Sequence, residues 1–505
     1  MYWLNENSRK FLAKDYLMNG QIAEDRIREI AEIAEKYLGK PGFADKFYDY
    51  MSRGFYSLAT PIWTNYGLSR GLPISCFSSY IADDMSRILY THAEVGMMTK
   101  YGGGTAGHFA DVRPRGSVID GNGHSSGAVH FMELFDNLIN IVSQGTVRRG
   151  HFAPYLPVEH GDIEEFLNIG KEGHPIQEST YAVTVTDKWL QDMVGGDQEK
   201  RRIWAKIIQR RTEIGYPYIL FSDTVNNNTV DVYKDKKMKI HGSNLCSEIA
   251  LPTSDEISFV CCLSSMNLRH YNEWKDTDAV ETLVMFLDTV ISSFLERLEA
   301  LRDSENPQKR SAFYFMERAY KFASEHRALG LGVLGWHTFL QENNIAMEDQ
   351  KAYDLNKEIF KLIHDKAYAA STQLAAEYGE PKILEGYGRR NTTLLAIAPT
   401  TSSAFILGQV SQSIEPMMSN CFVKDLDKIK VTIKNPALEK LLDEKGQNTN
   451  EVWSNIRDND GSVQHLDFLT NHEKSVFRTF AEIDQRVIIE QAADRQQFID
   501  QAQSL

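Results

Sequence analysis

The residues KAYDLNKEIFKLIHDKAYAASTQLAAEYG (351–379) and TTLLAIAP (392–399) decide the fold class. The first stretch is amphipathic over several turns and predicts a long helix, whereas the second is short, apolar and rich in β-branched residues, as strands are. The same alternation recurs earlier, with strands predicted at TYAVTVT (180–186) and YPYILF (216–221) and a helix over 278–301. Strands interleaved with long helices predict a large α/β domain.

Nearer the N-terminus the pattern is helical throughout. DRIREIAEIAEKYLG (25–39) places its apolar side chains on one face and ends at Gly39, where a helix C-cap falls, and FADKFYDYMSRG repeats this pattern up to Gly54. Gly, Ser and β-branched residues then become frequent. We therefore expect a helical region over residues 1–65 and a second domain over 66–505, in which a last helical pattern runs from about Asn471 to Asp500.

Composition excludes several classes of protein. The 505 residues are 42% hydrophobic and 25% charged, as in folded globular proteins, and the net charge of -14 disfavours unaided binding to nucleic acid or to anionic membranes. No stretch approaches the 18 apolar residues of a membrane span, and the first twenty residues lack the apolar core of a secretory signal. Five cysteines are too few for a disulfide scaffold. We expect a cytoplasmic protein, in the host cytoplasm if the source is viral.

Two glycine clusters lack the context of nucleotide-binding loops. Gly330, Gly332 and Gly335 spell G-x-G-x-x-G but follow the helix-like RAYKFASEHRA, so close helix packing is expected there. TKYGGGTAGHF lacks the Gly-Lys-Ser/Thr ending of a P-loop, and at most a flexible turn near a ligand is expected. No zinc-type spacing occurs, so no metal site is predicted, and His326 and His337 are expected to be structural.

Four of the five cysteines lie among polar residues. Cys421, in MMSNCFVKD, is expected to pack in a core, whereas the other four occur in LPISCFSSY (Cys76), HGSNLCSEIALP (Cys246) and SFVCCLSSMNL (Cys261 and Cys262). In a cytosolic protein such thiols serve packing, metal binding or redox chemistry, and no metal site is predicted here.

The segment around Cys246 is the best candidate for chemistry. Asn244 and Glu248 flank the thiol two residues to either side, so an extended backbone would point all three side chains to one face. An amide, a thiol and a carboxylate together can orient a hydroxyl, react at carbon or hydrogen, and take a proton. The alternative is a small buried thiol with solvated neighbours, and spacing alone leaves both open.

A run of hydroxyl residues follows the last predicted strand. In AIAPTTSSAF (396–405), the residues after Pro399 are Thr400, Thr401, Ser402 and Ser403. Such a run entering a helix can donate several N–H and O–H groups to a phosphate. An ordinary helix cap explains the same residues equally well.

Taken together, these motifs are similar to those of the large, catalytic subunit of class I ribonucleotide reductase. SLATPIWTN, SCF, SQGTVRRG, SNLCSEIALP, CCLSSMNL and PTTSS occur in the family's order, and the likeness extends from WLNENSRKFLAKDYL to FIDQAQSL. The resemblance implies a ten-stranded α/β barrel of two five-stranded halves, preceded by a helical region, with a central finger loop that presents Cys246.

The resemblance also implies the chemistry. Cys246 becomes a transient thiyl radical that removes the 3′-hydrogen of a ribonucleoside diphosphate, Glu248 accepts the 3′-hydroxyl proton, and Asn244 holds the sugar hydroxyl. Cys76 protonates the departing 2′-hydroxyl and then forms a disulfide with Cys261. Cys262 is the second choice for that partner, because it adjoins Cys261 where the family often has another residue.

Further site residues are carried over in the same way. The expected substrate contacts are Thr60, Ser75, Pro399, Thr400, Thr401, Ser402 and Ser403. A deoxynucleotide or ATP effector would bind at Asp83, Asp84, Met85 and Arg113, and a specificity loop containing Gly145, Arg148, Arg149 and Gly150 would connect the two sites. Contact of Asp120 with effector phosphate is not expected, because the family often has a basic residue there.

The family's partners are expected as well. They comprise a metal-containing small subunit that supplies the radical, thioredoxin or glutaredoxin as reductant, and a second copy of the chain in a homodimer. The N-terminal ATP-cone, the last barrel strands with their tyrosine pair, and the cysteine-bearing tail have no counterpart in the sequence. We therefore expect an incomplete barrel with an unpaired sheet edge. A gene split into two polypeptides, a truncated reading frame and an incomplete sequence all explain it, and we favour the split gene, in which a separate C-terminal polypeptide complements this chain.

Two other functions are weighed against this one. An adenosylcobalamin-dependent reductase would share the cysteine logic, but the short interval from Cys246 to Cys261 favours class I. A non-catalytic, nucleotide-binding fragment is the second alternative, and the presence of Asn244, Glu248 and the cysteines weighs against it.

Overall fold

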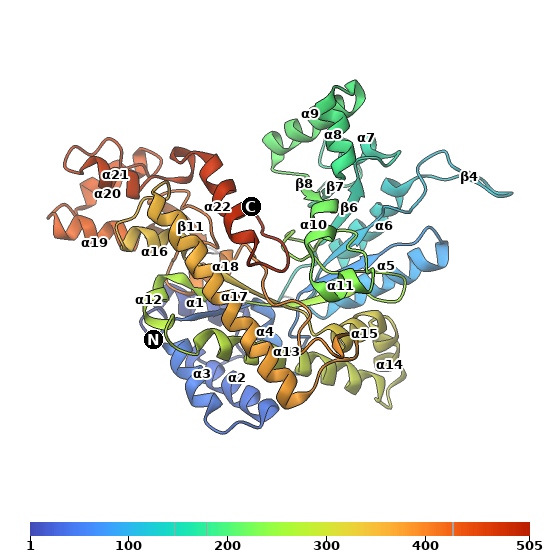
Figure 1. Ribbon diagram of the computed structural model, residues 1–505, viewed down its shortest axis with the longest axis horizontal. Coiled ribbons are helices and arrows are strands. Elements are labelled where there is room, and N and C mark those ends of the chain that lie inside the picture. The colour runs from blue at the N-terminus through green and yellow to red at the C-terminus, as the bar shows by residue number, and fades with distance from the viewer. Residues whose placement is uncertain (146, 178, 427–428) are drawn as a thin grey trace.

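The computed structural model describes residues 1–145, 147–177, 179–426 and 429–505. Its centre is a curled sheet of mixed strand direction, surrounded by helices (Figure 1). The strands are β1 (Tyr56–Leu58), β2 (Cys76–Tyr80), β3 (Gly104–His108), β4 (Val118–Ile119), β5 (Gly123–His124), β6 (Phe152–Pro157), β7 (Ala182–Val185), β8 (Tyr218–Phe221), β9 (Phe259–Asn267), β10 (Leu329–Leu334), β11 (Cys421–Leu426) and β12 (Ile429–Lys434).

Eight strands form the main sheet, in the order β1-β9-β2-β3-β6-β7-β8, with β10 beside β9. The strands β2, β3, β6, β7 and β8 run parallel and make one five-stranded half. The second half starts with β9, which is antiparallel to β2 and parallel to β10. It continues through isolated parallel bridges, from Leu331 to Leu395 and from Ile397 to Gln503.

The arrangement agrees with the predicted α/β barrel type but differs in its strand count. Among the described residues, the second half has only β9 and β10 as full parallel strands, because the segments near Leu395 and Gln503 each make one bridge rather than a ladder. The short β1, which pairs antiparallel with β9, was not predicted.

Helices cover both halves of the sheet. α5 and α6 pack on the five-stranded half (Figure 1), whereas α13 packs on β9 and β10 and against α17. The helices are α1 (Glu6–Asp15), α2 (Ala23–Leu38), α3 (Phe43–Ser52), α4 (Thr60–Asn65), α5 (Met85–Lys100), α6 (Ala128–Ile141), α7 (Ile163–Phe166), α8 (Asp187–Gly195), α9 (Gln198–Ile214), α10 (Ser222–Asn228), α11 (Asp231–Asp235), α12 (Tyr271–Trp274), α13 (Ala279–Arg302), α14 (Pro307–Tyr314), α15 (Glu317–His326), α16 (Trp336–Glu342), α17 (Gln350–Tyr378), α18 (Thr401–Ile406), α19 (Pro436–Glu444), α20 (Asn450–Asp458), α21 (Asn471–Val476) and α22 (Gln485–Gln496), with 3₁₀ turns at Leu268–His270, Lys382–Leu384 and Phe480–Glu482.

Most elements named from periodicity are confirmed, including β7, β8, α2, α3, α13 and α17. The single helix predicted over 471–500 is wrong. Capping boxes at Thr470/Glu473 and Thr479/Glu482 each start a new turn, so the segment divides into α21, a 3₁₀ turn and α22.

The glycine cluster at residues 330–335 is also corrected, because it forms strand β10 rather than a helix contact. A Cβ atom at Gly330 would lie 2.4 Å from the Leu263 side chain, and one at Gly332 would lie 2.6 Å from the Ala396 carbonyl oxygen. The glycines therefore allow neighbouring strands to approach closely.

The helical N-terminal region shares a core with the barrel. One cluster of buried side chains includes Trp3 and Trp63 as well as Trp274 and Trp336. The buried guanidinium of Arg26 donates to the carbonyl oxygens of α4, among them that of Trp63 at 2.9 Å. Division of the chain at residue 65 stays a prediction.

Candidate active site

The loop that carries Cys246 runs through residues 241–253, between α11 and β9, and has no regular secondary structure. The spacing of Asn244, Cys246 and Glu248 predicted an extended backbone, but the loop is not extended. Ser247 has a φ of 65°, and its N–H donates to the Asn244 carbonyl at 3.3 Å, so the chain turns at the thiol. This turn, rather than strand alternation, places the Asn244 amide nitrogen 3.0 Å from a Glu248 carboxyl oxygen.

Both halves of the barrel hold this finger loop in place. From the five-stranded half, the Tyr155 hydroxyl donates to the Asn244 carbonyl at 2.6 Å, and a Cβ at Gly242 would lie only 2.3 Å from the His108 ring. From the other half, the Ala502 N–H donates to the Glu248 carbonyl at 3.0 Å. The thiol is therefore presented by a fixed turn.

The sheet brings two further thiols together. Cys76 and Cys261 are direct partners across the antiparallel pair β2–β9. Such partners have Cα atoms about 4.5–5.5 Å apart, within disulfide reach, and both cysteines are free thiols here. Cys262 pairs with Leu329 of β10, and strand alternation directs it to the opposite face of β9. Cys421 packs in a separate buried cluster, as predicted.

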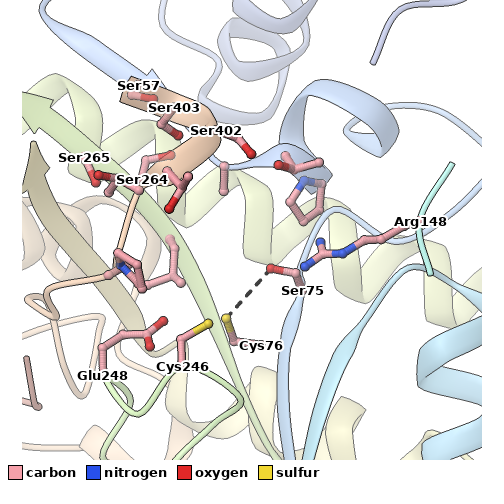
Figure 2. A pocket seen from close by; sticks show the side chains of 18 residues that line it. Ser57, Ser75, Cys76, Arg148, Cys246, Glu248, Ser264, Ser265, Ser402 and Ser403 are labelled. Atoms are coloured by element: carbon pink, nitrogen blue, oxygen red, sulfur yellow. Dashed lines mark hydrogen bonds between the residues drawn. The ribbon is translucent and has the colours of Figure 1, made fainter. Parts of the chain in front are cut away.

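A cavity of about 270 Å³ opens beside the finger loop. In Figure 2, the sulfur atoms of Cys246 and Cys76 point toward each other, Glu248 lies beside Cys246, and Ser402 and Ser403 lie at the opposite end. The complete lining is Ser57, Ala59, Thr60, Pro61, Ser75, Cys76, Arg148, Cys246, Glu248, Leu263, Ser264, Ser265, Ala398, Pro399, Thr400, Thr401, Ser402 and Ser403.

Of the residues that the resemblance assigns to the substrate, Thr60, Ser75, Glu248 and the run 399–403 line this cavity. Asn244 and Cys261 are absent from the lining and lie behind Cys76, which accepts a hydrogen bond from the Asn244 amide at 3.6 Å. The cavity therefore has a reactive end of thiols and a carboxyl and a binding end of hydroxyls.

Burial gives these groups unusual proton affinities. It raises the pKa of Glu248 to about 7, and the second carboxyl oxygen of Glu248 has no hydrogen-bond partner among the described residues. Burial also raises the pKa of Cys76 to about 12, and it raises the pKa values of Cys246 and Cys261 well above the usual range. At neutral pH the thiols keep their protons while the carboxyl is poised to accept one.

Arg148 is the one cation among the described residues that line the cavity. One of its guanidinium nitrogens is buried without a hydrogen-bond partner in the described part of the chain. Of the other predicted loop residues, Arg149 is exposed, Gly145 has a left-handed φ of 52°, and Gly150 packs against carbonyl oxygens in and just after the last turn of α6. Residue 146 of this loop lies outside the described residues.

The predicted effector residues gather at the start of α5, outside the cavity lining. The Asp83 carboxylate pairs with the Arg113 guanidinium at 2.6 Å, and Asp84 caps α5 by accepting from the Arg87 N–H at 3.1 Å. Met85 is 55% exposed, and Asp120 lies between β4 and β5.

Several residues at or near the site were missed by sequence reasoning. Ser57, Ser264 and Ser265 line the cavity, and the last two follow the cysteine pair in CCLSSMNL. Tyr155 and Gln501 contact the finger loop and Cys261 from distant parts of the chain. The three serines lie inside the motifs SLATPIWTN and CCLSSMNL, whereas Tyr155 and Gln501 carry no local signal.

Comparisons with known proteins agree with this geometry. A family model described as the barrel domain of ribonucleotide reductase matches residues 74–200, 196–383 and 381–505. The chain is a member of the class I ribonucleotide reductase large-subunit family.

Individual relatives of this family are similar over most of the chain. A putative ribonucleoside-diphosphate reductase large subunit of Frog virus 3 (isolate Goorha) is 37% identical, over 94% of this chain and 84% of the relative. The large subunit of Invertebrate iridescent virus 3 is 30% identical, over 91% and 82%. The Actinobacillus ureae class Id ribonucleotide reductase alpha subunit superposes with a TM-score of 0.92 and 55% identity, covering 99% of this chain and 90% of that one.

The described residues also show two absences. They contain no group of three or more His, Cys, Asp or Glu side chains placed to hold a metal ion. No helix among them is long and apolar enough to cross a bilayer.

Proposed function

We propose that this chain reduces ribonucleoside diphosphates to 2′-deoxyribonucleoside diphosphates, as the catalytic subunit of a class I ribonucleotide reductase. The proposal rests on one cavity that Cys246, Glu248 and Cys76 line together. Cys261 lies opposite Cys76 on the neighbouring strand. Family membership supports the same activity.

Each group has a chemical part in this proposal. The Cys246 thiyl radical takes the hydrogen atom from C3′, Glu248 accepts the 3′-hydroxyl proton, and Asn244 orients the sugar. Cys76 gives a proton to the departing 2′-hydroxyl, which leaves as water. Cys76 and Cys261 then supply two electrons and become a disulfide, and Cys246 returns its hydrogen atom to C3′.

The hydroxyl end of the cavity is proposed to bind the diphosphate. Thr60, Ser75 and the run Pro399–Ser403 offer uncharged donors, and Arg148 adds a positive charge without a protein partner at one nitrogen. Charge-assisted hydrogen bonds from such donors to phosphate oxygens are short and strong.

Partners and effectors extend the proposal. A small subunit supplies the radical, a dithiol protein of the thioredoxin or glutaredoxin type reduces the disulfide, and a second copy completes a homodimer. A deoxynucleotide or ATP binds near Asp83, Asp84, Met85 and Arg113 and signals through the loop 145–150. Because binding coupling is reciprocal, substrate then tightens effector binding by the factor by which effector tightens substrate binding.

The chemical proposal is tested with Cys246→Ser, assayed with the small subunit and a dithiol for conversion of radiolabelled ribonucleoside diphosphates. We expect loss of all product, because a serine hydroxyl does not form a radical of this reactivity. Cys421→Ser, which removes a thiol in a separate core, is the matched control and retains activity. Product from Cys246→Ser at the normal rate would contradict catalysis by this chain.

A cobalamin-dependent reductase is not favoured. The 55% identity to a class Id alpha subunit supports a radical supplied by a protein partner. Restoration of activity by adenosylcobalamin without a small subunit would reverse that preference.

A further inference from the structure

A buried amide lies directly behind the redox cysteines. Gln501, 4% exposed, sits where the segment after α22 passes the base of the finger loop. Its side-chain nitrogen is 3.7 Å from the Cys261 sulfur, 2.9 Å from the Leu329 carbonyl oxygen and 3.2 Å from the Thr393 hydroxyl. Its side-chain oxygen accepts the Ala250 N–H at 3.1 Å.

These partners fix the orientation of the amide. A flipped side chain would set its NH₂ group against the Ala250 N–H and its oxygen against the Leu329 carbonyl, so both contacts would become repulsive. Gln501 therefore directs an N–H toward Cys261. No hydrogen-bond donor reaches the adjacent Cys262 sulfur in the described part of the chain. Burial, with Cys76 and Asp288 nearby, raises the pKa of that thiol.

The two sulfurs of the redox pair differ in access. Cys76 lines the cavity with Cys246, whereas Cys261 is 1% exposed and does not line it. A reductant that enters the cavity thus reaches the Cys76 sulfur first, although the Asn244 amide also donates to that sulfur at 3.6 Å. Attack at Cys76 makes Cys261 the sulfur that leaves.

We propose that Gln501 is a positioning residue that makes Cys261 the leaving sulfur when the Cys76–Cys261 disulfide is reduced. The inference rests on the proposed function. One thiolate of a dithiol attacks the Cys76 sulfur, the disulfide bond breaks, and its electron pair passes to Cys261, whose thiolate the Gln501 N–H stabilises until it is protonated. The second thiol then displaces Cys76, so the dithiol gives two electrons and two protons and becomes a disulfide.

The experiment measures reduction of the disulfide directly. The reductase is allowed one turnover, and dithiothreitol is then added. Samples are quenched with an alkylating reagent, and Cys76 and Cys261 peptides are quantified by mass spectrometry. Gln501→Met keeps the length of the side chain and removes the donor. Gln503→Met is the matched control, because among the described residues that amide hydrogen-bonds only to the Ala492 carbonyl and to the Gln496 and Arg495 side chains.

We expect reduction in Gln501→Met to be ten- to a hundredfold slower, with product per single turnover of the pre-reduced enzyme unchanged. Gln503→Met should match the wild type in both assays. Equal reduction rates in all three proteins would overturn the inference. So would a parallel loss of single-turnover product in Gln501→Met, which indicates a structural role. If the wild type forms no Cys76–Cys261 disulfide on turnover, the proposed function itself fails.

A second variant covers the case in which Gln501→Met does not fold. Gln501→Glu keeps the acceptor for the Ala250 N–H and replaces the donor by a group that donates only when protonated. Its disulfide reduction should therefore slow as pH rises through the titration of that acid, relative to wild type. A pH profile parallel to wild type would overturn the inference.

Discussion

Burial gives individual residues of the site complementary protonation states: Glu248 can accept a proton, while the neighbouring thiols keep theirs. Burial disfavours every charged form, so it raises the pKa of the carboxyl to about 7 while it keeps the sulfurs protonated. A thiolate would be an unsuitable donor of a hydrogen atom, and a carboxylate with an ordinary pKa would be a weaker base. Burial at the reactive end of the cavity supplies both properties at neutral pH.

This balance predicts a pH dependence. Since only the ionised form of Glu248 accepts a proton, kcat/KM should fall as pH decreases through about 7, by a factor approaching ten per pH unit. Glu248→Gln should lower the rate by about 10²–10⁴-fold and abolish this limb. The measurement is a pH profile of product formation at saturating small subunit.

Glu415 provides the control for that profile. Its carboxyl also has a pKa raised by burial, but it lines a different cavity. Glu415→Gln should keep the acid limb, and a limb that persists in Glu248→Gln would contradict the assignment.

Part of the site follows from local sequence, and part does not. The set Asn244, Cys246 and Glu248 was found by spacing, although a turn at Ser247 rather than an extended strand joins the three. Gln501 was not found, because it reaches Cys261 across 240 residues of sequence. No local pattern records such a contact.

At the level of elements, the helix α5 is tied to both strands that carry Cys76 and Cys261. The buried Glu94 carboxylate accepts from Ser79 of β2 at 2.7 Å and from Ser258, which precedes β9, at 2.9 Å. It also forms a buried ion pair with Arg318 of α15. One carboxylate therefore joins four elements around the β2–β9 pair.

Removal of the cation should be costly. Arg318→Met leaves Glu94 buried without its counter-charge, and we expect the free energy of unfolding to fall by about 3–5 kcal/mol. Urea unfolding measures this loss. The double variant Glu94→Gln/Arg318→Met should recover much of it, because no unpaired charge remains. A double variant less stable than the single one would contradict the argument.

Strand β10 should not tolerate a side chain at Gly332. An added Cβ would meet the Ala396 carbonyl oxygen at 2.6 Å, so Gly332→Ala should destabilise the fold by about 1–3 kcal/mol. Gly195, at the end of α8, has open space around it and is the control. Thermal unfolding of both variants tests the prediction, which fails if the two have equal midpoints.

The long helices could be predicted from the sequence, whereas the glycine-rich strand β10 could not. Long amphipathic helices such as α13 and α17 are specified by their own periodicity and were located within a residue or two. β10 was missed because its glycines lower the local strand signal and become meaningful only against Leu263 and Ala396. The Thr and Glu residues of the capping boxes that divide residues 470–485 are present in the sequence, but the prediction of one helix did not take them into account.

Across the whole molecule, three buried histidines predict sensitivity to acid. Burial lowers the pKa of His108 and His326 to about 3 and that of His337 to about 4. The folded state then binds fewer protons than the unfolded state below about pH 6.5, so stability falls as pH decreases. Three such groups together lower the free energy of unfolding by roughly 4 kcal/mol per pH unit, while Glu248 acts in the opposite direction between its unfolded and folded pKa values.

Urea unfolding at pH 7.5, 6.5 and 5.5 measures this dependence. His326→Gln, which keeps a polar partner for the Tyr233 hydroxyl, should reduce the slope by about 1.4 kcal/mol per pH unit, the contribution of one titrating group. An unchanged slope would show that His326 is not neutral in the folded protein.

The order of strands in the barrel was beyond local sequence patterns. Period and composition indicate which segments are strands, but the pairing of β2 with β9 depends on packing between distant segments. That order was anticipated only through family resemblance. The number of regular strands in the second half was not, because single bridges at Leu395 and Ile397 replace full ladders.

The seam between β2 and β9 has a consequence for how the protein is made. Cys76 and Cys261 become neighbours only after 185 residues of intervening chain have been enclosed, and Ala502 must arrive before the Glu248 carbonyl is held. Contacts of such long sequence separation form slowly, since the entropy of loop closure is lost before they contribute. On the ribosome, the three thiols therefore emerge as separate, ordinary cysteines. They come together at one site only when synthesis has passed residue 502 and the fold has formed around them.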